Sequence, residues 1–219
     1  MSVISAIVAA PRQPGRFAIL VDGESIATLS IDAIEQLQLA VGKDIGSIID
    51  RIALEAAQIK VYDRAINVLA FRARSSAELS RALIRKGEER IHVERAIERL
   101  KAQGLLDDAA FAQSFTRAKV LGANQSRRRV QQELARKGVP RDVTDAAIDV
   151  VFEEEGVDQR VIVEQAARKK MKSLRALEPA VRRRRLYGFL ARRGYDGDDI
   201  RRAMETVGEE LQEDESTDE

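Results

Sequence analysis

An internal repeat is the feature of this sequence that most constrains its fold. Three segments end in two cations and a glycine: ALIRKG at 82–87, ELARKG at 133–138 and FLARRG at 189–194. The glycines lie 51 and 56 residues apart, and apolar residues follow each of them at the same three offsets. Those residues are Ala96, Ile97 and Leu100, then Ala147, Ile148 and Val151, then Ala203, Met204 and Val207. The sequence therefore predicts a tandem array of similar modules.

Helix start and stop signals divide each module into three helices. Ser75–Glu78 has the form of a capping box, and Gly104 stands where a glycine closes a helix. Pro140 and Pro179 suit a first helical turn. A module of about 50 residues cannot bury its apolar faces alone and usually stacks on its neighbours. We therefore expect an all-α fold of tandem three-helix repeats in an elongated array.

The first 58 residues do not follow the repeat. Residues 16–29 alternate as two short strands around Asp22-Gly23, a pair that suits a type I′ hairpin turn. A helix is predicted from the Ser30 cap to Gly42, and another over residues 47–74. An isolated hairpin is marginal in water, so we expect this small β-hairpin to pack on a helix.

These signals predict five segments along the chain. We expect an N-terminal β-hairpin and helix extension at 1–58, repeats at 59–104, 105–155 and 156–208, and an acidic tail at 209–219. The tail holds seven carboxylates and no cation, a composition typical of disorder. It serves either as a solubilising end or as a segment that competes with an anionic ligand for the third repeat.

Charge is segregated along the chain although its sum is only +1. Residues 1–59 and 153–219 each carry −3, whereas residues 60–152 carry +7. The most positive stretch is residues 168–202, with 13 cations and 4 acidic residues. Patterned charge of this kind indicates a polyanionic or acidic partner.

The cations fall into three groups with different reasons for their positions. Pairs of cations that precede a closing glycine lie at the C-terminus of a helix, where their charge also complements the helix dipole. Arg127–Arg129 occupy a first turn, where the dipole disfavours cations, so an external anion explains them better. Arg182–Arg185 surround a helix, so at least one must face a neighbour or a ligand. The candidate partner-binding or DNA-binding residues are Arg85, Lys86, Arg127, Arg128, Arg129, Arg136, Lys137, Arg182, Arg183, Arg184, Arg185, Arg192 and Arg193.

Catalytic groups are scarce in this sequence. Cysteine is absent, and the single histidine, His92, is interpreted as a structural residue. Asp107-Asp108 could bind Mg²⁺, but we expect it to cap a helix. Glycine-rich phosphate loops are also absent. We therefore expect no enzyme, no metal site and no cofactor.

Apolar runs are too short to span a membrane, and the N-terminus lacks the pattern of a secretory signal. We expect a cytoplasmic monomer. Most of the nine aromatic residues, Phe71 among them, fall on apolar stripes. Base stacking is therefore not the expected mode of binding.

An ordered set of motifs resembles the RecX family of recombination regulators. The motifs are Leu79–Gly87, Gly104–Asp108 with Phe111-Ala112 and Arg117, Leu134–Val139, and Arg192–Tyr195 with Ile200. The resemblance implies a non-enzymatic regulator of homologous recombination and the SOS response. Such a protein binds the groove of the RecA recombinase filament and mainly inhibits its growth, ATP hydrolysis, strand exchange and co-protease activity.

A second function remains open, that of a helical repeat protein that binds DNA without a filament. Three-helix units with basic helix starts can imitate helix-turn-helix domains. The nearest approach to a recognition helix is residues 125–137, through Gln125, Arg128, Gln131 and Gln132. Either single-stranded or double-stranded DNA would be held through phosphate contacts.

Overall fold

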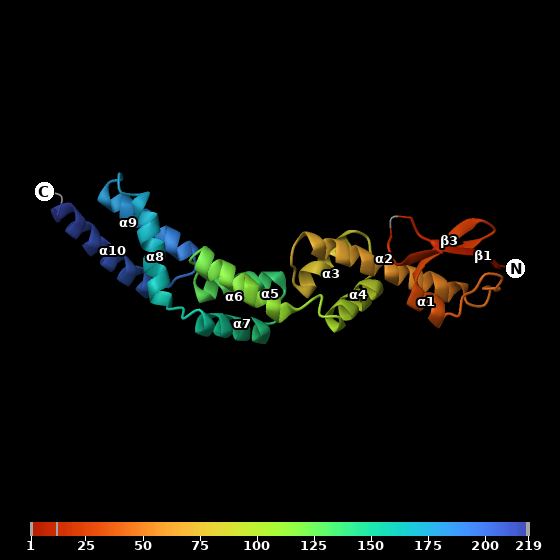
Figure 1. Ribbon diagram of the computed structural model, residues 1–219. Helices are drawn as coiled ribbons and strands as arrows, with labels where there is room; N and C mark the ends of the chain where they lie inside the picture. Colours follow the sequence, from red (N-terminus) through yellow and green to blue (C-terminus); the bar gives the residue numbers. More distant parts are fainter. Residues whose placement is uncertain (1, 12, 218–219) are drawn as a thin grey trace. The chain divides into compact units, whose positions relative to one another are not determined.

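The computed structural model describes residues 2–11 and 13–217, which form two compact units (Figure 1). The first unit comprises the chain up to Arg74 together with Glu78–Leu106, and the second comprises Ser75–Ala77 together with the chain from Asp107. Helices make up most of both units, and the first unit also contains a small sheet. The predicted helical repeat fold with a small N-terminal β element is confirmed.

The N-terminal sheet has three antiparallel strands in the order β1-β2-β3. They are β1 (Ile4–Ala9), β2 (Arg16–Val21) and β3 (Glu24–Ser30). Asp22 and Gly23 join β2 to β3 with φ values of +52° and +85°. Both values are positive, as a type I′ turn requires, so the predicted hairpin is confirmed.

Strand β1 is an addition to the predicted two-stranded hairpin. Its Ile7 lies opposite Ile19 of β2, and its Ile4 N–H donates to the carbonyl oxygen of Lys43 at 3.0 Å. Contacts with residues distant in sequence therefore hold both edges of β1. Periodicity within Ile4–Ala9 could not reveal those contacts.

Two helices follow the sheet. Helix α1 (Ile31–Gln36) begins at Ser30, whose Oγ accepts from the Ala33 N–H at 3.3 Å. The helix ends well before the predicted stop at Gly42, because Gln38 adopts a positive φ of +50°. Helix α2 (Ile49–Phe71) runs without interruption, as predicted.

Helix α2 contributes to two apolar cores of the first unit. Ile52 and Ile59 pack with the sheet and α1, whereas Val61 and Ala65 pack with the next two helices. Those helices are α3 (Ser76–Arg85) and α4 (Arg90–Ala102). The boundary expected between residues 58 and 59 therefore lies inside one continuous helix.

The second unit contains two further sets of three helices. The first set is α5 (Asp108–Arg117), which continues into the π-helical turn η1 (Ala118–Gly122), α6 (Arg127–Lys137) and α7 (Arg141–Glu154). The second set is α8 (Gln159–Lys172), α9 (Pro179–Arg192) and α10 (Gly197–Thr217). Buried residues of both sets share one apolar core.

Equivalent positions of the repeat adopt equivalent conformations. Leu83, Leu134 and Leu190 of the three middle helices are fully buried. Each middle helix is followed by a glycine with a φ between +80° and +87°. The glycines are Gly87, Gly138 and Gly194. A left-handed residue at this position closes a helix and satisfies its last carbonyl groups.

The acidic C-terminal segment differs from the expectation. Residues 209–217 continue α10 as helix, whereas composition favoured a disordered tail over 209–219. This segment lacks proline and glycine and contains Glu, Gln and Leu, which are strong helix formers. Extension of a packed helix also avoids the cost of a new nucleus. The last two residues of the expected tail lie outside the described range.

Within the described ranges, no helix combines the length and the apolar character that a bilayer span requires.

Candidate partner-binding surface

Cations that precede the closing glycines have several structural contacts. The Lys137 ammonium lies over the rings of Phe111 and Phe115, with distances of 5.6 and 5.2 Å to their centroids. The Arg193 guanidinium lies 4.4 Å from the centroid of the Phe189 ring and donates to the carbonyl oxygen of Ala123. Both cations therefore stabilise the repeats.

The remaining residues of this group are more exposed. Arg85 Nε donates to the carbonyl oxygen of Arg81 at 3.4 Å. Arg136 is exposed and also has partners. Lys86 and Arg192 are exposed, and their side chains have no hydrogen bond or ion pair within the described part of the chain. Only these last two are fully available to a partner.

Arg127–Arg129 do not act as a single cluster. Arg127 forms an ion pair with Asp149 of α7 and lies over the Phe152 ring. Arg129 Nε donates to Glu133 Oε1 at 2.9 Å. Arg128 is exposed and has no partner among the described residues. The argument from the helix dipole for an external anion therefore applies only to Arg128.

A carboxylate that sequence reasoning missed, Glu133, balances the charge of cations at the start of α6. Its carboxylate accepts from Arg129, lies 3.2 Å from Lys119 Nζ and accepts from Gln125 Nε2 at 3.3 Å. Burial opposes ionisation, but the hydrogen bonds from Lys119 and Arg129 lower the pKa of Glu133 below its ordinary value. Glu133 thus neutralises cations from two helical segments and fixes their positions.

Arg182–Arg185 form the largest group of unpaired cations in the described structure. Arg182 is half-buried, and the three that follow it are exposed. None of their four side chains has a hydrogen bond or an ion pair in the described ranges. By contrast, Arg201 and Arg202 of the adjacent α10 pair with Asp198 and Asp199. The unpaired cations on α9 are therefore the strongest candidates for contact with an anion.

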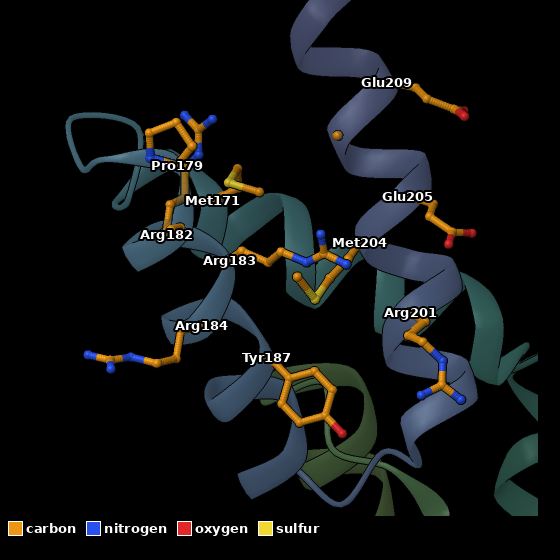
Figure 2. Close-up of a pocket in the computed structure, with 12 residues that line it drawn as sticks. Met171, Pro179, Arg182, Arg183, Arg184, Tyr187, Arg201, Met204, Glu205 and Glu209 are labelled. Atoms are coloured by element: carbon orange, nitrogen blue, oxygen red, sulfur yellow. The ribbon is translucent and has the colours of Figure 1, made fainter.

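Three of these arginines line a pocket of about 930 Å³ between α9 and α10 (Figure 2). Arg182, Arg183 and Arg184 line it from α9, together with Tyr187. The rest of the lining is Met171, Pro179, Ala180, Arg201, Met204, Glu205, Gly208 and Glu209. The pocket combines cationic and apolar groups in one site.

Sequence reasoning identified the arginines of this pocket but not its apolar part. Tyr187 directly follows the buried Leu186 and is 43% exposed. A tyrosine next to an apolar stripe and close to four arginines was the signal available in the sequence.

The expectation for Phe71 was wrong. Phe71, which was placed on an apolar stripe, is instead 90% exposed at the end of α2. It ends its helix and so lies beyond the packed face.

The carboxylates considered as a metal site act as helix caps. Asp107 Oδ1 accepts from the backbone N–H groups of Ala109 and Ala110 at 2.8 and 3.0 Å. Asp108 Oδ1 accepts from the Ser76 N–H at 2.8 Å. His92 is buried. No group of three potential metal ligands occurs in the portion of the chain that the structure describes.

Family profiles match the three helical repeats in order. Residues 62–100 match "RecX, first three-helix domain", residues 107–148 match "RecX, second three-helix domain" and residues 161–204 match "RecX, third three-helix domain". These ranges follow the three sets of helices described above.

Curated relatives resemble the chain over most of their own length. Regulatory protein RecX of Chlorobaculum tepidum is 34% identical over 157 residues, which cover 71% of this chain and 94% of the relative. Regulatory protein RecX of Halorhodospira halophila is 36% identical over 157 residues, with coverage of 71% and 92%. Both likenesses include most of the relative rather than an isolated domain.

Solved structures show the same fold. A crystal structure of regulatory protein RecX matches with a TM-score of 0.73 and 22% identity, and covers 95% of this chain and 100% of the other. RecX from Lactobacillus salivarius matches with a TM-score of 0.57 and 17% identity, and covers 69% and 97%. With 95% coverage, the first likeness also includes most of the N-terminal region.

Proposed function

The chain belongs to the RecX family of regulatory proteins, and on that premise we propose that it binds the RecA recombinase filament and modulates its activity. Binding mainly inhibits filament growth, ATP hydrolysis, strand exchange and co-protease activity. The protein acts by contact and not by catalysis, as a regulator of homologous recombination and the SOS response. It works in the cytoplasm as a monomer.

The observation that carries this proposal is the presence of all three RecX helical domains in family order. A tandem repeat offers several similar surfaces in series, which suits a partner that is itself a repeating filament. The unpaired cations Lys86, Arg128, Arg182–Arg185 and Arg192 supply charge for acidic protein surface or for DNA phosphate in the filament. Rim charges of this kind mainly accelerate association and select partners.

Contacts in and just before α6 argue against the alternative of a helix-turn-helix protein that recognises DNA sequence. Gln125 Nε2 donates to Glu133 at 3.3 Å, and Gln131 Nε2 donates to Asp145 Oδ1 at 2.7 Å. Those amides are therefore occupied within the second repeat. Arg128 and Gln132 alone remain of the polar face that sequence analysis considered, which is too little for base readout in a groove.

Co-sedimentation tests the proposal. The purified protein is mixed with host recombinase assembled on single-stranded DNA with a slowly hydrolysed ATP analogue, and the filaments are pelleted. DNA alone and recombinase without DNA serve as controls. We expect the protein to pellet with filaments in a saturable manner and much less with DNA alone. Equal recovery with DNA alone and with filaments would contradict the proposal and support a stand-alone DNA-binding protein.

A further inference from the structure

The pocket between α9 and α10 has an apolar floor. Met171 of α8 is 7% exposed, and Met204 of α10 is partly buried against the same core. Methionine is flexible and polarisable, and it occurs often at surfaces that accept helices or extended peptides of varied sequence. Tyr187 adds an exposed ring at the end of the pocket (Figure 2). The floor therefore suits an apolar side chain of a partner.

The α9 side of the pocket is cationic. Figure 2 shows Arg183 reaching from α9 toward Met204, while Arg184 points away from α10. Neither guanidinium has a partner within the described chain. Arginine is weakly hydrated and forms bidentate pairs with carboxylates, so Arg183 can bind an anion next to the apolar floor and Arg184 can bind a second anion at the outer edge of the pocket.

Charge changes sign across the pocket. Glu205 and Glu209 belong to its α10 side, where they project away from α9 (Figure 2). Glu205 has no ion pair in the described structure. A nucleic-acid strand carries a phosphate at every nucleotide, so a strand laid across the pocket would bring phosphates to the α10 edge that carries these carboxylates as well as to the arginines of α9. A peptide can place its anionic side chains on one side only, so the arrangement favours a peptide.

We propose that this pocket docks an acidic segment of a protein partner. Carboxylates of that segment pair with Arg182, Arg183 and Arg184, and one Leu, Ile, Met or Phe side chain packs on Met171 and Met204. The inference rests on the proposed function only in taking the segment to belong to the recombinase filament. It adds the chemistry of the contact and its place in the third repeat.

A direct probe is a fluorescent peptide with the sequence of residues 209–219, because that sequence surrounds one leucine with seven carboxylates. A second peptide replaces the leucine with serine. Anisotropy at low salt should show binding of the first peptide to the full-length protein, and at least about tenfold weaker binding of the second. The affinity should fall as salt rises, since the ion pairs are exposed.

The test variant is Arg183→Glu with Arg184→Glu, both at exposed positions. Its matched control is Arg141→Glu with Arg160→Glu, which makes the same change in net charge at exposed first turns of α7 and α8. Glutamate is favourable at those first turns. Met204→Gln tests the apolar floor. Circular dichroism and thermal melting verify that each variant folds.

We expect the test variant to lose at least about tenfold in affinity for the acidic peptide and for recombinase filaments, while the control keeps wild-type affinity. Met204→Gln should weaken peptide binding without any change in the salt dependence.

Three other outcomes would contradict a proposal. If the wild-type protein pellets with filaments and the test variant pellets equally well, the proposed docking role of the pocket is wrong and the proposed function stands. If the wild-type protein fails to pellet, the proposed function itself is wrong. A test variant that loses affinity only for a DNA oligonucleotide would assign the pocket to phosphate, and would also overturn the inference.

Discussion

The backbone N–H of Ser126 donates a hydrogen bond of 3.1 Å to the carbonyl oxygen of Arg193. This bond joins the N-cap of α6 to the C-cap of α9, so it links the second repeat to the third. Ser75 stands at the equivalent position of the first repeat, and its Oγ donates to the Lys137 carbonyl oxygen at 2.6 Å within the second compact unit. Within the second unit, the carbonyl oxygen of the residue before a closing glycine is therefore a docking point for a serine at a helix start, as well as part of a helix end.

Gly194 tests the importance of this docking. A Cβ at this position would lie 2.6 Å from Ser126 Oγ and 2.8 Å from Arg129 Cβ, in addition to the strain of a φ of +87°. Overpacking costs about 1–3 kcal/mol beyond that strain. We expect Gly194→Ala to destabilise the second unit by at least about 1 kcal/mol more than Gly156→Ala.

Gly156 is the matched control because it lies in the same unit, has a φ of +57° and meets nothing within 4 Å. Urea unfolding followed by circular dichroism measures both variants. Equal losses for the two substitutions would mean that the neighbouring repeat relaxes around the new methyl group.

Glu133 should make stability depend on pH. Its pKa is lowered in the folded state, so its contribution is present above the unfolded pKa of about 4.3 and is lost as pH falls through the folded pKa. Glu133→Gln should cost about 1 kcal/mol at pH 7, because its partners are partly exposed. The difference between wild type and variant should shrink below about pH 4. A difference that is constant down to pH 2 would show that its origin is not ionic.

The three arginines at the start of α6 should separate into two classes. Arg127→Ala and Arg129→Ala should each lower stability, because each removes the partner of a carboxylate. Arg128→Ala should leave stability unchanged. If Arg128 contacts phosphate, its loss should reduce the slope of log affinity against log salt by about 0.9 on duplex DNA and about 0.7 on single strands. An unchanged slope would remove Arg128 from the DNA-contacting set.

Much of the fold follows from local signals in the sequence. Leu83, Leu134 and Leu190 could be aligned because similar motifs surround them, and each is fully buried. The positive φ of Asp22 and Gly23 follows equally from turn chemistry. By contrast, Arg127 and Asp149 are 22 residues apart, and their pairing depends on how α6 packs against α7. The pocket could not be predicted from local sequence for the same reason, because it depends on the packing of three helices that contribute Met171, Tyr187 and Met204.

Substitutions of Asp107 test whether this residue acts as a helix cap or as a metal ligand. Asp107→Ala should cost about 1 kcal/mol through the loss of the α5 cap, whereas Asp107→Asn should cost less because asparagine also caps well. Added Mg²⁺ should leave the melting temperature of the wild-type protein unchanged. Metal-dependent DNA cleavage that disappears in Asp107→Asn would show instead that this residue takes part in catalysis.

The most direct test of recombinase regulation is the rate of DNA-dependent ATP hydrolysis by the host recombinase, titrated with this protein before and after filament assembly. We expect a saturable fall in the rate with the wild-type protein and a shift to higher concentrations with Arg183→Glu/Arg184→Glu. The Arg141→Glu/Arg160→Glu control should follow the wild type. A hydrolysis rate that stays constant at every concentration of wild-type protein, in both orders of addition, would contradict the account.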